Sequence, residues 1–561
     1  MQLSEQEIVR REKLSKLREL GINPYPADLY PVNHTSKKIK ESFAEGKQVV
    51  IAGRLMRKKI QGKASFAELQ DSDGRIQVYF NRDEICPEED KTLYNDIFKK
   101  LLDLGDFIGI EGELFTTQVG EKTVMVKNFT LLSKALRPLP LPKEKDGVVY
   151  DKFDDPEQRY RQRYTDLVVN PQVKEVFVKR TKLFNAMRNF FNDAGYFEVE
   201  TPILQPIPGG AAARPFMTHH NSLDIPLYMR IANELYLKRL IVGGFDGVYE
   251  FSKNFRNEGM DRTHNPEFTA MEIYVAYKDY NWMMDFTEKL LEHCAIAVNG
   301  KTTATFGKHE IDFKAPYKRI TMTQSIIDFT GFDITGKSEE ELFEAAQNMG
   351  VSVDKTMGKG KLIDEIFGEK CEGRYIEPTF ITDYPKEMSP LCKEHRENPE
   401  LTERFELMVC GKEIANAYSE LNDPIDQRER FEAQLKLSEK GDDEAMFIDD
   451  DFIRALEYGM PPTSGLGIGM DRLIMYLTNN PSIQEVLFFP QMRPENKKVA
   501  ISEEAKAILE ILKKAEKLPL NDLKAQAGLS NKKWDKSIKE LTKNNLANVE
   551  KTDDGLFVEL V

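Results

Sequence analysis

Between residues 196 and 494, strand and helix patterns alternate irregularly, and this restricts the possible folds more than any other property of the sequence. Parallel sheets need crossover helices and so show a regular βαβ rhythm, which is absent here. We therefore expect an α+β fold in which helices flank an antiparallel β-sheet. Residues from about 316 to 400 carry fewer strand signals, which indicates a helical insertion within this domain.

The preceding segment, residues 47–136, has the pattern of a small β-barrel. Alternating apolar and polar residues predict five short strands, with a helical stretch before the fourth. Asp71 to Gly74 read Asp-Ser-Asp-Gly, which is typical of a tight turn between the second and third strands. This order is that of the OB-fold, a common nucleic-acid-binding platform.

The remaining segments are predicted to lie on either side of these two domains. Residues 1–46 form an N-terminal helix, which ends before Gly21, and a lead-in. The proline-rich stretch 137–145 cannot continue a sheet, so it opens a linker, 137–164, before a large domain at 165–495. Residues 500–561 show helices followed by a hairpin at Asp554-Gly555, which predicts a winged-helix-like extension.

Charge clustering says more about nucleic-acid binding than the net charge of −14 does, because phosphate contacts need only local basic groups. Between residues 49 and 67, basic residues occur without any Asp or Glu: Arg54, Arg57, Lys58, Lys59 and Lys63. A solvated charged face is the alternative. From Val499 onward, 11 basic and 11 acidic residues cancel, so a packing or protein-contact module is favoured over a nucleic-acid-binding one.

Cysteine spacing and hydropathy exclude several classes of protein. Five cysteines without CxxC spacing argue against disulfides and zinc, so we expect packing residues at Cys86, Cys294, Cys371, Cys392 and Cys410. The N-terminus resembles no secretory signal, and no apolar run is long enough to span a bilayer. We therefore expect a cytoplasmic protein without membrane contact.

Residues 248–277 are predicted to form two strands joined by a loop of turn-forming residues. On the first strand, the alternation places Glu250, Arg256 and Glu258 on one face. On the second, Phe268, Ala270, Glu272 and Tyr274 share a face opposite Met271, Ile273 and Val275. An aromatic ring, an arginine and acids beside a His264-Asn265-Pro266 loop favour the floor of a ligand site over an ordinary surface hairpin.

A second cluster, residues 405–423, places Glu406, Glu413 and Glu420 among apolar residues. Their spacing of seven breaks strand alternation, so either a turn at Cys410-Gly411-Lys412 resets the face or one element ends between them. Carboxylates so placed predict Mg²⁺ coordination, since hard cations take oxygen ligands and bridge to phosphates. A helix with exposed acids is the alternative.

A third cluster, residues 464–477, has small residues before an amphipathic helix. Its glycines permit close backbone approach, but the context fits neither a dinucleotide-binding nor a P-loop motif. Arg472, at the start of the helix, is free to meet an anion or to stack on a base.

Taken in order, these clusters resemble the signature motifs of class II aminoacyl-tRNA synthetases, and the resemblance covers about residues 5 to 494. Residues 184–204 resemble motif 1, residues 255–268 (FRNEGMDRTHNPEF) motif 2, and residues 465–473 (GLGIGMDRL) motif 3. The OB-like domain implies the subclass for lysine, aspartate or asparagine. Residues 235–259 and 271–280 are similar to the lysine enzymes, and acids in the pocket suit an ammonium group better than a carboxylate.

The resemblance implies roles for individual residues in binding L-lysine and ATP. Arg256 would hold the α-phosphate and the lysine carboxylate, and Phe268 would stack on adenine, with Arg472 covering its other face or the γ-phosphate. The nucleotide site would be completed by Glu258, His264, Asn265 and Gly469. Lysine would be bound by Gly210, Glu234, Glu272, Tyr274, Asn416 and Glu420. More than one Mg²⁺ ion is implied, with Glu406 and Glu413 as ligands.

The resemblance also implies partners and a two-step reaction. Lysine would be activated with ATP and then transferred to the 3′ end of tRNA(Lys), whose anticodon would contact Phe66, Gln77 and Arg54. Motif 1 implies a homodimer around Pro202. The alternatives are an aspartyl or asparaginyl enzyme, and a synthetase-like protein that charges no tRNA, although modifiers of that kind lack an OB-like domain.

Overall fold

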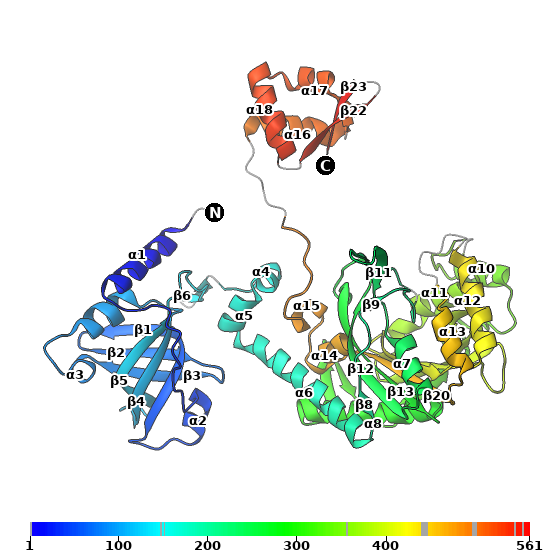
Figure 1. The fold of residues 1–561 in the computed structure, drawn as a ribbon, viewed down its shortest axis with the longest axis horizontal. Coiled ribbons are helices and arrows are strands. Elements are labelled where there is room, and N and C mark those ends of the chain that lie inside the picture. The colour runs from blue at the N-terminus through cyan, green and yellow to red at the C-terminus, as the bar shows by residue number, and fades with distance from the viewer. Residues whose placement is uncertain are drawn as a thin grey trace. The chain divides into compact units, whose positions relative to one another are not determined.

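The computed structural model describes residues 3–145, 148–150, 152–211, 213–354, 357–438, 447–495, 502–515, 517–543, 546–552 and 555–560. The chain divides into two compact units, Met1–Gln491 and Met492–Val561 (Figure 1).

The first unit begins with a helix and a closed five-stranded barrel. Helix α1 (Glu5–Glu19) is capped by Ser4, whose side chain and backbone both exchange hydrogen bonds with Glu7. The barrel order is β1-β2-β3-β5-β4, which confirms the predicted OB-fold. Its strands are β1 (Gln48–Gln61), β2 (Ala64–Gln70), β3 (Arg75–Asn81), β4 (Phe107–Thr116) and β5 (Lys122–Ser133). Short helices join them: α2 (Ser36–Glu41), α3 (Arg82–Ile85) and a π-helix (Leu93–Leu101).

The predicted linker contains more regular structure than its prolines indicate. Strands β6 (Lys143–Lys145) and β7 (Val148–Tyr150) form a separate two-stranded antiparallel sheet, so the stretch 137–145 does not continue the barrel, as predicted, but its last three residues form a strand that was not predicted. The proline-rich part of the stretch ends at Pro142, and the residues of β6 have backbone N–H groups to donate. Helices α4 (Pro156–Arg161) and α5 (Arg163–Val169) follow.

An eight-stranded sheet forms the centre of the large domain, in the order β16-β17-β18-β19-β20-β13-β12-β8. Every pair from β17 to β12 is antiparallel, which confirms the predicted class, but the two edge pairs, β16–β17 and β12–β8, are parallel. Its strands are β8 (Phe197–Glu198), β12 (Gly247–Phe255), β13 (Glu267–Ala276), β16 (Lys318–Thr321), β17 (Thr379–Pro385), β18 (Leu401–Val409), β19 (Lys412–Ser419) and β20 (Thr463–Gly469).

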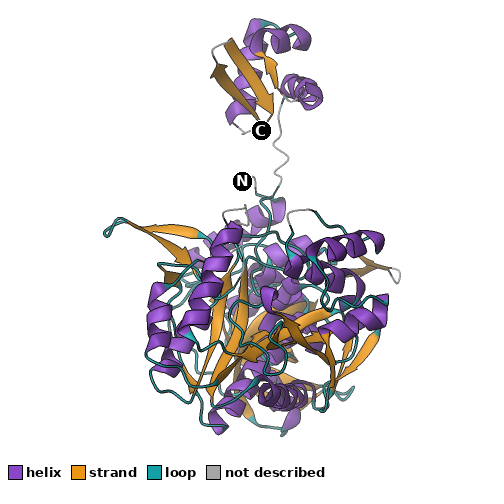
Figure 2. Ribbon diagram, turned by 90° about the vertical axis from the view of Figure 1, so that its right-hand side faces the viewer, coloured by secondary structure: helices purple, strands orange, loops and turns teal. Residues whose placement is uncertain are grey.

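Helices cover the apolar face of this sheet (Figure 2). Helices α6 (Pro171–Asp193) and α8 (Tyr280–Asn299) pack against each other and supply Met187 and Leu290 to the core. From the sheet, Met271, Ile273 and Leu466 enter the same core. The opposite face of the central strands is therefore left for polar groups.

The predicted helical insertion at 316–400 was too wide. Strands β16 and β17 lie within that range and belong to the main sheet, because their backbones pair with each other and β17 pairs with β18. Between them, helices α9 (Met322–Thr330), α10 (Glu339–Asn348) and α11 (Lys359–Lys370) form a separate apolar core.

Other elements of this unit are β9 (Leu204–Gln205), β10 (Met217–His220), β11 (Ile225–Met229), α7 (Glu234–Val242), β14 (Thr303–Phe306), β15 (His309–Asp312), α12 (Pro424–Ser438), α13 (Asp450–Glu457), α14 (Met470–Leu477) and α15 (Ile483–Val486).

The second unit has the predicted order of helices followed by a hairpin. Its elements are α16 (Glu503–Ala515), β21 (Lys517–Pro519), α17 (Leu520–Ala527), α18 (Asn531–Lys543), β22 (Ala547–Thr552) and β23 (Gly555–Leu560), with sheet order β21-β23-β22. Asp554, named in the predicted turn, lies outside the described residues.

Two further predictions concern side chains and the membrane. All five cysteines are free, and four of them are buried, as expected of packing residues. No helix in the described part of the chain combines enough length and apolar character to cross a lipid bilayer.

Candidate functional site

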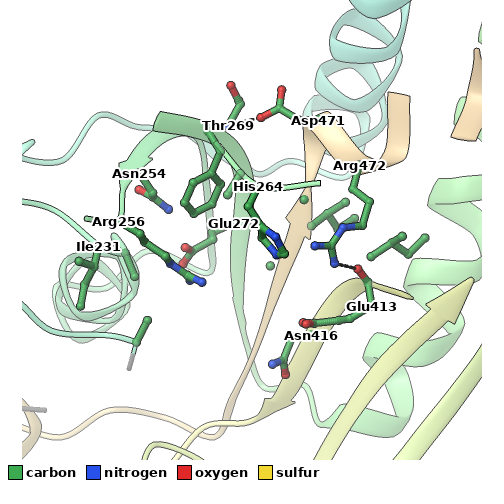
Figure 3. Close-up of a pocket in the computed structure, with 18 of the residues that line it drawn as sticks. Ile231, Asn254, Arg256, His264, Thr269, Glu272, Glu413, Asn416, Asp471 and Arg472 are labelled. Carbon is green, nitrogen blue, oxygen red and sulfur yellow. Dashed lines mark hydrogen bonds between the residues drawn. The ribbon is translucent and has the colours of Figure 1, made fainter. Parts of the chain in front are cut away.

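A cavity of about 390 Å³ opens on the polar face of the central strands β12, β13, β19 and β20 (Figure 3). The β12–β13 loop and the start of α14 form further walls, together with residues 210–211 and 231–232, Glu234 and Ile483. Two predicted ligand residues of this domain, Glu406 and Glu420, do not line it. The cavity brings together the others: Gly210, Glu234, Arg256, Glu258, His264, Asn265, Phe268, Glu272, Tyr274, Glu413, Asn416, Gly469 and Arg472.

The alternation predicted for the second strand of the 248–277 hairpin is confirmed. Phe268, Glu272 and Tyr274 of β13 line the cavity, whereas Met271 and Ile273 are fully buried in the core on the other face. A strand places successive side chains on opposite faces, so one strand serves both the ligand side and the core.

The alternation predicted for the first strand was wrong beyond its end. Strand β12 stops at Phe255, and Asn257 N–H donates to the carbonyl of Arg214 instead of to β13, which turns the chain out of the sheet. Arg256 and Glu258 reach the cavity from the loop. Glu250 shares the sheet face of its cross-strand partner Glu272, but it does not line the cavity, and its carboxylate forms a 2.7 Å salt bridge with Arg230.

Arg256 presents a guanidinium that lacks protein partners for part of its donors. The group lies 5.1 Å from the centre of the Phe268 ring, and its buried Nε has no hydrogen-bond partner among the described residues. Figure 3 shows the side chain pointing into the cavity. A buried donor without a partner is costly, so this position favours an anionic ligand.

The cavity is also lined by carboxyl groups that gather around buried hydroxyls, and we call this part of the cavity its acidic end. Tyr418 donates a 2.7 Å hydrogen bond to Glu234 Oε1, and Tyr274 donates a 3.1 Å bond to Glu272 Oε2. Burial and then the charge of Glu234 raise the pKa of Glu272 to about 8. The acidic end therefore favours a positively charged ligand.

Lys238 on α7 lies behind this acidic end and was not predicted. Its ammonium is fully buried, lies 2.5 Å from Glu234 Oε1 and forms a second salt bridge with Glu420 Oε2. Glu420 Oε1 has no hydrogen-bond partner among the described residues. With Glu272, this end holds three carboxyl groups and one ammonium. The spacing of Glu234 and Lys238, four residues apart on a helix, is the signal that could have indicated the pair.

Two glycines allow the groups of the acidic end to pack closely against the backbone. A Cβ at Gly465 would overlap Glu420 Oε1 and the Tyr274 ring, so only glycine permits this approach. Gly210 has a φ of 85° and lies against Ala232 and Glu234, where a Cβ would approach both side chains at 3.1–3.2 Å.

The start of α14 is fixed to the hairpin by Asp471. This carboxylate accepts a 2.7 Å bond from Thr269 N–H and forms a 2.7 Å salt bridge with Arg180. The next residue, Arg472, donates to the backbone carbonyl of Glu413 and points into the cavity (Figure 3). Arg472 lines the cavity, and its contact with an anion or a base stays a prediction.

Glu406 and Glu413 lie close enough for their charges to interact. Cys410 and Gly411, both with positive φ, form a turn between β18 and β19 and pair Val409 with Lys412. The turn changes which side chains share a sheet face, and this is the first of the two explanations offered for the spacing of seven. Burial and then the charge of Glu413 raise the pKa of Glu406 to about 8, although Arg404 donates a 2.6 Å bond to it. Two carboxylates with unbalanced charge suit Mg²⁺, which takes one or two protein carboxylates and completes its shell with water and phosphate.

The loop residues expected to bind nucleotide are held at the rim of the cavity. His264 Nδ1 lies 2.9 Å from Asp261 Oδ2, and Asn265 donates to the carbonyl of Glu267 at 2.5 Å. Glu258 is exposed and lines the same rim. These contacts order the loop while leaving its polar groups beside the opening.

In the barrel, aromatic rings form a half-exposed row. The Phe66 and Tyr79 ring centres are 5.0 Å apart, and those of Tyr79 and Phe115 are 5.8 Å apart. Gln77 is on β3 beside them and donates a 2.9 Å bond to Thr123. Such a row suits stacked bases of a single strand.

Two of the five clustered basic residues, Arg54 and Lys58, are engaged by other groups of the barrel domain. Arg54 stacks 4.2 Å from the Phe107 ring centre and donates to Gly105 O, and its strand position pairs with Gln70 and not with Phe66. Lys58 donates to three carbonyls near the end of the π-helix, and burial lowers its pKa to about 8. Arg57, Lys59 and Lys63 are exposed.

Comparisons with known proteins match both domains. Residues 155–493 match the family described as tRNA synthetases class II (D, K and N), and residues 49–132 match the family described as OB-fold nucleic acid binding domain.

Individual relatives are also highly similar. A lysine–tRNA ligase of Christiangramia forsetii is 78% identical over 560 residues, covering 100% of this chain and 98% of the relative. One of Porphyromonas gingivalis is 70% identical over 500 residues, 88% of this chain and 86% of the relative. One of Azobacteroides pseudotrichonymphae is 65% identical over 88% of this chain and 99% of the relative, so part of this chain has no counterpart there.

Proposed function

The chain belongs to the class II tRNA synthetases and, within them, to the lysine–tRNA ligases, and we propose that its cavity binds lysine and ATP side by side. One observation carries this assignment of the site: a single cavity is lined both by carboxyl groups and by Arg256, whose buried Nε has no hydrogen-bond partner among the described residues. Lysine has the complementary polarity, an ammonium on its side chain and a carboxylate on its backbone.

The acidic end would bind the lysine side chain. Glu234 keeps Oε2 available, because Lys238 and Tyr418 both occupy Oε1. Glu272 likewise has one oxygen bonded to Tyr274 and one open. Asn416 and Gly210 line the path between these groups and Arg256, and Glu420 would act through Lys238.

The other end would bind ATP. Phe268 offers a ring face for adenine, and Arg472 offers the donors that Glu413 O does not use. Glu258, His264, Asn265 and Gly469 line the rest of the nucleotide space. Arg256, between the two ligands, would contact both the α-phosphate and the lysine carboxylate.

In the activation step, a lysine carboxylate oxygen attacks the α-phosphorus, the bond to the bridging oxygen breaks, and pyrophosphate leaves. Arg256 and Arg472 neutralise charge that builds up on the transferring and leaving groups. In the second step a terminal tRNA hydroxyl attacks the adenylate carbonyl and AMP leaves. We assign no general base to the protein and expect the adenylate phosphate to assist.

Magnesium fits the carboxylates beside the nucleotide space. We propose that Glu406 and Glu413 hold it, more than one ion in all, and that bound Mg²⁺ would neutralise phosphate charge. In its absence the two side chains repel, as the raised pKa of Glu406 indicates.

We assign anticodon binding to residues 47–136 and catalysis to residues 165–495, with 1–46, 137–164 and 500–561 as lead-in, linker and extension. Phe66 and Gln77 would stack on and hydrogen-bond an anticodon base. We leave Arg54 out of this site, because its guanidinium is held by Phe107 and Gly105.

A homodimer is supported by exposed apolar side chains near Pro202, which is itself exposed. Phe197 is 58% exposed and contacts Phe245, and Leu204 is 50% exposed. Apolar surface of this kind is typical of a protein interface. We also propose that the enzyme works in the cytoplasm.

The test is ATP–pyrophosphate exchange with each of the twenty amino acids, with Mg²⁺ and without tRNA. We expect exchange with lysine alone, and Glu272→Gln should weaken it. Exchange with aspartate or asparagine would keep the fold and overturn the pocket assignment, whereas exchange with no amino acid would overturn the proposed site.

A further inference from the structure

Helix α18 of the second unit has one strongly basic face. Four of its lysines, Lys532, Lys536, Lys539 and Lys543, are exposed. At 3.6 residues per turn, these positions fall within an arc of about 60°. We refer to these four residues as the lysine stripe.

The lysine stripe lies opposite the side of α18 that packs into its unit. Trp534, Ser537 and Leu541 are buried, and they alternate with the stripe along the helix. Helix α16 packs against this buried side and shares its apolar cluster. The stripe therefore points away from the core.

The nearby charges do not cancel the stripe. Lys533, on the neighbouring position, forms a 2.7 Å salt bridge with Glu504, and Glu540 accepts from Ser502. The four stripe lysines form no salt bridge within the described part of this unit, where the lysines that form salt bridges are Lys506, Lys513, Lys517 and Lys533. Among the stripe residues, Lys536 lies near enough to Glu504 for their charges to interact. Asp535 is the one acidic residue of α18 that borders the stripe without such a bond. The basic and acidic residues from Val499 onward are equal in number, yet basic residues gather on one face of α18.

The position of α18 in its unit is that of a nucleic-acid-reading helix. It is the third helix, and the β22–β23 hairpin follows it directly, which is the order of a winged helix. The stripe spans 11 residue steps, or about 16 Å, a length over which a duplex carries several phosphates. Lysine is a point charge that contacts phosphates and does not read bases.

We propose that the lysine stripe of α18 binds the phosphate backbone of a tRNA stem, without base specificity. The inference rests on the tRNA-charging function, which brings the same RNA to the chain. The A-form major groove is too narrow to admit a helix, so the stripe would lie along the phosphates. Because the unit is covalently attached to a tRNA-binding enzyme, even a weak contact would act at high effective concentration.

The test compares two full-length variants that each lose four positive charges from the second unit. The stripe variant carries K532Q, K536Q, K539Q and K543Q. The control variant carries K506Q, K513Q, K514Q and K524Q, which lie on α16 and α17. Binding of a fluorescent tRNA(Lys) transcript is measured by anisotropy from about 50 to 200 mM salt, and circular dichroism checks that both variants fold.

We expect the stripe variant to bind tRNA at least about a hundredfold more weakly than the control at about 50 mM salt, with a salt dependence of log Kd reduced by about 3. The difference should shrink as salt rises. Equal affinity and equal salt dependence in the two variants would overturn the proposal and favour a protein-contact role for the stripe. Lysine-dependent ATP–pyrophosphate exchange needs no tRNA, so both variants should keep it; its loss in the unaltered enzyme would instead overturn the proposed active site.

Discussion

Proton release on lysine binding follows from the environment of Glu272. Its side chain is buried, and burial and then the charge of Glu234 raise its pKa to about 8, while the Tyr274 hydroxyl and Arg230 act in the opposite direction. In the free enzyme at pH 7, a group with this pKa is protonated in about nine molecules of ten. An ammonium placed beside it stabilises the carboxylate and lowers the pKa again.

Lysine binding should therefore release about 0.9 proton at pH 7, about 0.5 at pH 8, and very little at pH 9. The Kd for lysine should fall about tenfold between pH 6 and pH 7 and become nearly constant above pH 8. Whereas lysine binding strengthens as pH rises, the free energy of unfolding of the lysine-free protein should fall. A carboxyl group with a raised folded-state pKa stabilises the fold below its unfolded pKa of about 4.5 and loses that contribution as pH rises through about 8.

Isothermal titration calorimetry at pH 7 in two buffers with different ionisation enthalpies measures the number of protons directly. Glu272→Gln is the matched control, because its amide keeps the shape and cannot titrate. Glu420 also has a pKa raised by burial, but it pairs with Lys238 and does not line the cavity. If lysine binding releases no proton, or if Glu272→Gln releases as many as the unaltered enzyme, the reasoning fails.

Three further predictions concern other parts of the site. Lys238→Met should destabilise the fold by about 3–5 kcal/mol in urea denaturation, because it leaves buried carboxylates without their cation; a change below about 1 kcal/mol would contradict this. Arg256→Ala should slow adenylate formation about 10²–10³-fold in pyrophosphate exchange with little change in stability, and near-normal exchange would argue against its role. Phe66→Ala should weaken tRNA binding by about 1–3 kcal/mol and spare lysine activation; equal loss of both would reject its anticodon contact.

The strand face in the active site could be predicted because strand periodicity is strict. Alternation along residues 268–275 separated ligand residues from core residues correctly on β13. The same logic failed for Arg256 and Glu258, since nothing in the alternation marks where β12 leaves the sheet. That point is set by a distant bond, from Asn257 N–H to Arg214 O.

Charged residues with structural roles could not be predicted from the sequence. Lys238 occurs in a helical pattern where a lysine usually faces solvent. Its pairing with Glu234 is local, but its second salt bridge depends on the tertiary approach of Glu420. Arg54 and Lys58 belong to a run that indicates a binding surface, yet both donate to backbone carbonyls within the barrel domain. The parallel edge strands were missed for a similar reason, because pairing at a sheet edge depends on segments distant in sequence.

The most direct test of the two-ended cavity is a crystal structure with a non-hydrolysable lysyl-adenylate analogue. We predict that the side-chain ammonium lies within hydrogen-bond distance of Glu234 and Glu272, and that Arg256 contacts the phosphate mimic. An ammonium that points away from both carboxylates, or an analogue bound in the reverse direction, would contradict it.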